Sequence, residues 1–130
     1  MMKHLKIEQS VDTPSVDFNP VKGFLELEGK SFPSDVTAFF YPLLDWLDEY
    51  AKSPASKSTV NLKLEYFNTA SSKMLLEIFN RLEKIYKNGS EVEVNWYYPE
   101  DDDDMRETGQ EYSELIKIPF KQIGYSVFFK

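Results

Sequence analysis

The chain has 130 residues, enough for one domain around a single core, and its 15% aromatic content argues against wholesale disorder. A net charge of −7 argues against a broad basic surface for nucleic acid and against binding to an anionic membrane. Cysteine is absent, which excludes disulfides, thiolate metal sites and cysteine nucleophiles, and the single histidine, His4, nearly excludes a His-rich metal site and a conventional Ser-His-Asp triad.

The N-terminal part of the chain has the pattern of β-strands. Apolar residues from Leu5 to Val11 predict a short first strand, and Val16 and Phe18 predict a second extended segment. Residues 24–29 again alternate between apolar and charged. Because a turn signal at 19–23 separates the two segments, they are predicted to pair as a hairpin.

Helices and strands then alternate. Apolar spacings of three and four predict an amphipathic helix over about 35–52, capped by Ser34 or Asp35, with a kink or restart at Pro42. A second amphipathic helix is predicted to end near Asn88-Gly89. Strict alternation predicts strands over 60–67 and 92–98, which precede and follow that helix.

The last part of the chain starts with the acidic run Glu100–Asp104. Alone such a run is typical of a solvated, disordered patch, but acids also favour the positive end of a helix dipole. A short helix is therefore predicted over about 102–116, weakened by Gly109, followed by a last strand that reaches Val127 and Phe128. The whole order predicts a single α/β domain over 1–130, with helices packed on a mixed sheet.

The segment Tyr66–Lys73 places small hydroxyl residues where a strand passes into a helix. Unpaired amides at a helix N-terminus hold anions well, so a phosphoryl group on Thr69 is compatible with the fold. A simpler interpretation of the same residues is that Thr69 or Ser71 is an ordinary N-cap.

This segment resembles the phosphoacceptor region of the SiaC family of bacterial signalling proteins. The resemblance continues over about residues 7–123, in matching order and spacing. Its pieces are Thr13-Pro14-x-Val16-x-Phe18, Gly23-x-Leu25-x-Leu27-x-Gly29-Lys30-Ser31, Phe40-Tyr41-x-Leu43-x-x-Trp46-Leu47, Trp96-Tyr97-Tyr98, and Glu100 to Met105 with Gly109.

The resemblance implies a fold similar to the SpoIIAA-like (STAS-like) anti-sigma-factor antagonists and a non-enzymatic partner-switching phosphoprotein without a cofactor. It implies a dedicated kinase, a PP2C-type phosphatase and a target such as a diguanylate cyclase, bound by the unphosphorylated form, with cyclic di-GMP and biofilm control as output. Thr69 is the implied phosphoacceptor and Ser71 the second choice, because Ala70 and Ser71 follow it. Residues expected to contact partners are Asn68, Ser72, Tyr97, Asp101, Asp102, Asp103 and Asp104.

Two other interpretations remain open at this stage. The acids Asp101–Asp104 have the oxygen ligands of a Mg²⁺ or Ca²⁺ site and would suit a metal-dependent enzyme, although consecutive residues rarely all face one ion and no EF-hand spacing is present. The chain could also be a constitutive scaffold. Trp96 is expected in the core and Tyr97 on the opposite side of its strand, while His4 is expected at the surface without a partner. The absence of a membrane-length apolar run or signal-peptide core predicts a cytoplasmic protein.

Overall fold

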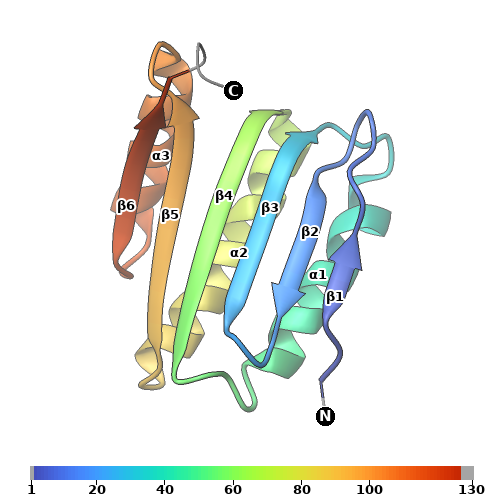
Figure 1. Cartoon of the computed structure of the whole chain (residues 1–130), viewed down its shortest axis with the longest axis vertical. Helices are drawn as coiled ribbons and strands as arrows, with labels where there is room; N and C mark the ends of the chain where they lie inside the picture. The colour runs from blue at the N-terminus through green and yellow to red at the C-terminus, as the bar shows by residue number, and fades with distance from the viewer. Residues whose placement is uncertain (1, 127–130) are drawn as a thin grey trace.

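In the part of the chain that the structure describes, the alternating and amphipathic segments form one six-stranded sheet and three helices (Figure 1). The computed structural model describes residues 2–126. The elements are β1 (Leu5–Ile7), β2 (Ser15–Asn19), β3 (Phe24–Ser31), α1 (Val36–Tyr50), β4 (Lys57–Phe67), α2 (Thr69–Lys87), β5 (Glu91–Pro99), α3 (Asp103–Leu115) and β6 (Phe120–Tyr125).

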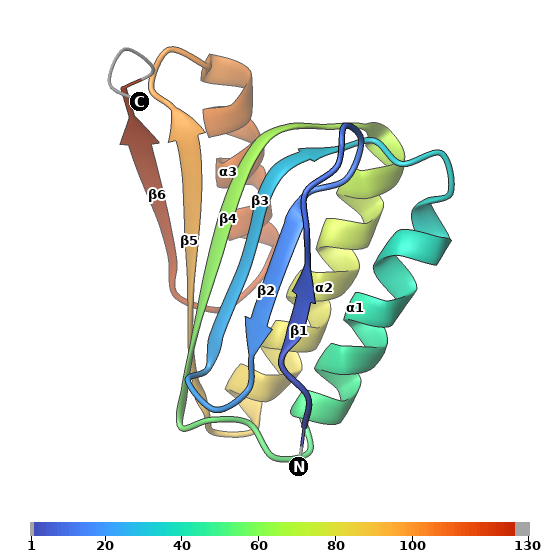
Figure 2. The ribbon, with the colours of Figure 1, turned by 45° about the vertical axis from the view of Figure 1, so that its right-hand side comes forward.

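The strands lie side by side in chain order, from β1 to β6. β1, β2 and β3 pair antiparallel, as the predicted hairpin requires, whereas β3 to β6 pair parallel. All three connecting helices cover the same face of the sheet (Figure 2). The ends of β3 to β6 and the beginnings of the helices therefore meet at one margin, at the top of Figure 1, called here the carboxyl edge. The predicted mixed α/β fold is confirmed.

The core lies between the sheet and the helices. Alternate strand residues such as Leu25, Leu62 and Val94 are at most 2% exposed and pack against the apolar stripes of α1 and α2. Trp96 is buried on this side, as predicted, and its indole Nε1 donates to the Met105 carbonyl of α3 at 3.1 Å. That hydrogen bond satisfies the one polar atom of a large apolar ring and fixes α3 over β5.

The other face of the sheet carries no helix of the described residues and is the face toward the viewer in Figure 1. Most of its side chains are polar, and several of its charged side chains form ion pairs with one another. Lys63 contacts Glu26 at 3.2 Å, and Lys121 contacts Glu93 at 3.1 Å. We call this surface the open face.

Three local expectations differ from the structure. The first strand ends at Ile7, and Val11 is 87% exposed, because the chain turns where the Ser10 amide donates to the Thr13 carbonyl. α1 does not restart at Pro42. Proline has no amide hydrogen to donate to the carbonyl one turn earlier, but Pro42 is at an exposed position, where that carbonyl can bond water. His4 does have a partner, since its Nε2 lies 2.5 Å from Asp17 Oδ1.

The remaining helix predictions are confirmed with small changes. Asp35 caps α1 by accepting from the Ala38 amide, and α2 ends at Lys87, with Asn88 as the C-cap and Gly89 after it at φ 105°. Gly109, expected to weaken α3, is buried against Trp96. Val127 and Phe128, predicted in the last strand, lie outside the described residues. No helix within residues 2–126 is long and apolar enough to cross a membrane.

Candidate functional site at the start of α2

The junction of β4 and α2 is built around Asn68. The Asn68 amide donates to the Ser31 carbonyl at the end of β3, and its side-chain Oδ1 accepts from the Ser71 amide at 2.9 Å. Asn68 is therefore the N-cap, one residue before Thr69 and three before Ser71, the two residues expected to cap the helix. This cap leaves the amides of Thr69 and Ala70, in the first turn, without a hydrogen bond to the described chain.

Thr69 and Ser71 have opposite environments. Thr69 is the first residue of α2 and is exposed, and among residues 2–126 its hydroxyl has no hydrogen-bond partner. Ser71 is fully buried, with its Oγ 2.8 Å from Ser31 Oγ and 3.1 Å from the Ser31 carbonyl. A modifying enzyme can reach the Thr69 hydroxyl directly, whereas Ser71 would have to leave the core first.

A shallow recess separates Thr69 from α3. Its lining comes from the end of β4, the first turn of α2 and one face of α3: Phe67, Asn68, Thr69, Ser72, Thr108, Glu111, Tyr112 and Leu115. The Tyr112 hydroxyl donates to the Ser72 carbonyl at 2.8 Å, which ties α3 to the first turn of α2. Burial raises the pKa of Tyr112 to about 12, so this phenol keeps its proton and its role as a donor at neutral pH.

Charges of both signs lie near Thr69. Glu111 is the one charged residue among the described residues that line the recess. Lys73 follows Thr69 by four residues on α2, the spacing of side chains that neighbour each other on a helix, and it is exposed. A phosphoryl group on Thr69 would gain from the helix dipole and its free amides, but it would add negative charge beside Glu111 on a chain of net charge −7.

The expected partner-contact residues fall in three places. Asn68 and Ser72 lie together at the start of α2, beside the expected phosphoacceptor Thr69. The acidic run lies at the β5–α3 connection, also at the carboxyl edge, where Asp102 caps α3 by accepting from the Met105 amide, and Asp103 and Asp104 occupy the first turn. Within residues 2–126 no group of three or more His, Asp or Glu side chains is placed to hold a metal ion.

Tyr97 lies on the open face of β5, away from Thr69. Lys63 Nζ lies 5.1 Å from the centre of its ring and also contacts Glu26, so Tyr97 belongs to a small charged network on the sheet. The structure thus separates Tyr97 from the Thr69 recess by the thickness of the sheet.

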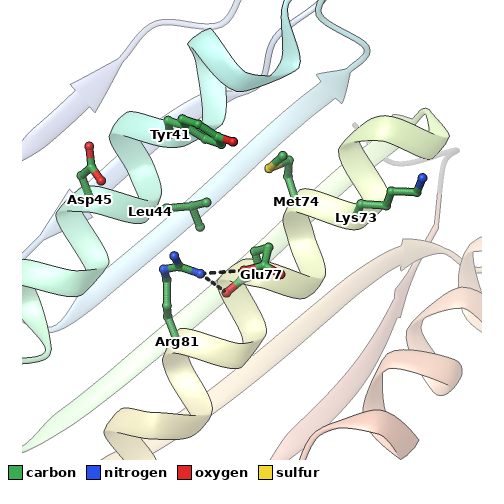
Figure 3. Close-up of a pocket in the computed structure, with 7 residues that line it drawn as sticks. All are labelled: Tyr41, Leu44, Asp45, Lys73, Met74, Glu77 and Arg81. Atoms are coloured by element: carbon green, nitrogen blue, oxygen red, sulfur yellow. Dashed lines mark hydrogen bonds and ion pairs between the residues drawn. The ribbon is translucent and has the colours of Figure 1, made fainter.

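A hollow between α1 and α2 begins one turn after Thr69 (Figure 3). Tyr41 and Leu44 of α1 and Met74 of α2 supply its apolar surface, and Tyr41 is 53% exposed. Charged side chains surround this surface, with Arg81 held by Glu77 at 2.9 Å. The hollow places an exposed aromatic ring and a thioether beside the same end of α2.

Sequence reasoning missed Ser31, Thr108, Glu111 and Tyr112 as parts of this site. Ser31 and Tyr112 each contact the first turn of α2 from 40 residues away in the sequence. Tyr112 lies within the helix predicted over about 102–116, but nothing in the pattern indicated which element it would contact.

The comparisons with known proteins identify the family of the chain. The model of the SiaC family of regulatory phosphoproteins matches residues 7–125. An uncharacterized protein of Pseudomonas aeruginosa strain UCBPP-PA14 is 27% identical over 119 residues, which cover 92% of this chain and 94% of that protein.

Two solved structures extend the agreement to the fold. The crystal structure of apo-SiaC from P. aeruginosa matches with a TM-score of 0.86 and 27% identity, over 95% of this chain and all of that one. A crystal structure of the P. aeruginosa diguanylate cyclase SiaD in complex with its activator SiaC matches with a TM-score of 0.88 and 25% identity, over 93% and 99% of the two chains. The chain described here belongs to the SiaC family of regulatory phosphoproteins.

Proposed function

We propose that this protein is a non-catalytic signalling switch whose partner binding is controlled by reversible phosphorylation of Thr69. The observation that carries the proposal is the contrast at the start of α2, where the Thr69 hydroxyl is exposed and unbonded while that of Ser71 is buried against Ser31. Membership of a family of regulatory phosphoproteins supports a phosphorylated residue. At this junction the Thr69 hydroxyl is exposed and unbonded, whereas that of Ser72 is half-buried and donates to the Thr69 carbonyl at 2.6 Å.

The target proposed for the unphosphorylated form is a diguanylate cyclase. Support comes from the related SiaC, which is an activator bound to the cyclase SiaD. A cytoplasmic kinase and a PP2C-type phosphatase would set the fraction of modified protein, with cyclic di-GMP as the output.

The switch is electrostatic. A partner that covers Thr69 must remove water from it, and removing water from an unpaired phosphate dianion costs several kcal/mol. The recess itself does not repay that cost, because the one charged residue among its described lining residues is Glu111. Phosphorylation is therefore expected to lower the affinity for the target by two or more orders of magnitude, since about 1.4 kcal/mol changes affinity tenfold.

The first test is phosphosite mapping by mass spectrometry on the protein from its native cells, lysed in a metal chelator to stop a metal-dependent phosphatase. A phosphate on Thr69 supports the proposal. A phosphate on Ser71 would keep the switch and move its site, and an unmodified chain under every growth condition would favour a constitutive scaffold.

The second test measures target binding. Wild type and Thr69→Ala should capture the same diguanylate cyclase, and the chain phosphorylated on Thr69 should not. Thr37→Ala is the matched control, because Thr37 is an exposed threonine in the first turn of α1. Equal capture by the modified and unmodified chains would contradict the switch.

A further inference from the structure

One row of side chains along α2 has alternating charge that is missing at its first position. Residues four apart are neighbours on a helix, and this row consists of Thr69, Lys73, Glu77 and Arg81. Its second half is paired, because Arg81 Nη1 lies 2.9 Å from Glu77 Oε1 and Arg81 Nε lies 3.0 Å from Asp48 of α1. Its first half is not paired, since among residues 2–126 Lys73 forms no ion pair and the Thr69 hydroxyl no hydrogen bond.

The order of charges along α2 explains why Lys73 has no partner. Its side chain is exposed and points away from α1 and from the pair of Glu77 and Arg81 (Figure 3). An acid four residues before a base stabilises a helix more than the reverse order, and Glu77 before Arg81 has the favourable order. Lys73 before Glu77 has the reverse order, whereas a phosphate on Thr69 before Lys73 would have the favourable one. The position that suits an anionic partner of Lys73 is therefore occupied by the exposed hydroxyl of Thr69.

We infer that Lys73 is the internal counter-ion of a phosphate on Thr69 and holds that phosphate against the first turns of α2. The inference rests on the function proposed above and states how the chain accommodates its modification. A phosphate on the first helical residue is also favoured by the helix dipole and by the amides that the Asn68 cap leaves free. Phosphorylation is therefore expected to leave α2 folded, so that it changes the charge of the surface and not the fold.

The modification would reverse the charge of this part of the surface. In the unmodified chain Lys73 is an unpaired cation that lines the hollow between α1 and α2 together with Tyr41 and Met74. A phosphate carries nearly two negative charges at neutral pH, so Thr69 and Lys73 together would change from about one positive to about one negative charge. A partner that covers Thr69 must still remove water from that net charge, and Glu111 across the recess adds to it. Pairing with Lys73 therefore does not cancel the switch.

The test measures the second pKa of the phosphate by ³¹P NMR. Phosphothreonine is incorporated at position 69 of the full chain during translation, so the result does not depend on whether cells modify Thr69. An ammonium group beside the dianion favours the doubly charged form, so Lys73→Gln should raise this pKa by about 0.3 at low salt. Lys73→Arg keeps the charge and should restore the wild-type value. In about 1 M salt the difference between wild type and Lys73→Gln should disappear.

Lys84→Gln is the matched control for the loss of one positive charge. Lys84 is another exposed lysine of α2 without an ion pair among residues 2–126, and it lies about 22 Å along the helix from Thr69. This variant should leave the pKa of the phosphate unchanged. Equal pKa values in wild type and Lys73→Gln would overturn the inference, and so would an equal rise in Lys73→Gln and Lys84→Gln.

Urea unfolding tests whether the modified helix stays intact. The phosphorylated chain should unfold at the same or a higher urea concentration than the unmodified chain, and Lys73→Gln should lower that concentration only for the phosphorylated one. A phosphorylated chain that unfolds at lower urea, or an equal effect of Lys73→Gln on both forms, would contradict the inference. None of these outcomes bears on whether cells phosphorylate Thr69, which the phosphosite mapping decides.

Discussion

The hydroxyl of Ser71 lies 2.8 Å from that of Ser31 inside the core, and this contact joins the start of α2 to the end of β3. The Ser71 Oγ also reaches the Ser31 carbonyl, at 3.1 Å. Two small polar residues thus close the junction where two neighbouring strands end. The two hydroxyl residues therefore have different roles, because Ser71 stabilises the fold from inside the core while Thr69 is exposed at the surface.

Because of this difference, two similar substitutions are predicted to lower the free energy of unfolding by different amounts. Ser71→Ala should lower the free energy of unfolding by about 1 kcal/mol, the usual contribution of one buried hydrogen bond. Thr69→Ala should change it by less than about 0.5 kcal/mol, since an exposed side chain without a partner is removed. Urea unfolding followed by circular dichroism measures both. Similar costs for the two variants would show that Thr69 has a structural role.

The N-cap of α2 makes the next prediction. Asn68→Ala removes the acceptor of the Ser71 amide and should cost about 1 kcal/mol of unfolding free energy. Asn68→Asp keeps an acceptor oxygen at the same place and should recover most of that loss. The comparison is again made by urea unfolding, and a full loss in the aspartate variant would argue against capping as the cause.

The sequence pattern predicted the elements better than it predicted their contacts. Each strand and helix has one buried face, so alternation in β4 and β5 and the stripes of α1 and α2 carry that information locally. The recess beside Thr69 depends instead on where α3 packs, which Tyr112 and Ser72 decide from 40 residues apart. The N-cap was predicted at Thr69 or Ser71, one or three residues late, because asparagine, serine and threonine all stand at this junction and all cap well.

Gly109 illustrates how tertiary contact overrides helix propensity. Alanine usually stabilises a helix by about 1 kcal/mol relative to glycine. Here, however, a Cβ at Gly109 would lie 2.5 Å from Trp96 Cδ1. Gly109→Ala should therefore destabilise the protein by about 1–3 kcal/mol, the usual cost of overpacking, and perturb the tryptophan fluorescence. Gln110→Ala, at the next and exposed position, is the control and should be neutral or slightly stabilising. A more stable Gly109→Ala variant would contradict the close packing of α3 on β5.

The buried phenol of Tyr112 makes stability depend on alkaline pH. Its pKa is raised from 10.0 to about 12, so between these values the unfolded chain loses a proton that the folded chain retains. The stabilisation is complete below pH 10 and is lost as the pH rises toward 12, by at most about 2.7 kcal/mol for two pKa units. Tyr112→Phe lacks this proton, and its own cost comes from the lost hydrogen bond to Ser72. The unfolding free energy of the wild type minus that of Tyr112→Phe should be constant from pH 7 to 9.5. Above that range it should decrease, because only the wild type loses the stabilisation from the Tyr112 proton. Urea unfolding at a series of pH values measures this difference. The other tyrosines and the lysines titrate equally in both proteins, so their effects cancel. A difference that stays constant to pH 12 would show that Tyr112 is not the buried group responsible.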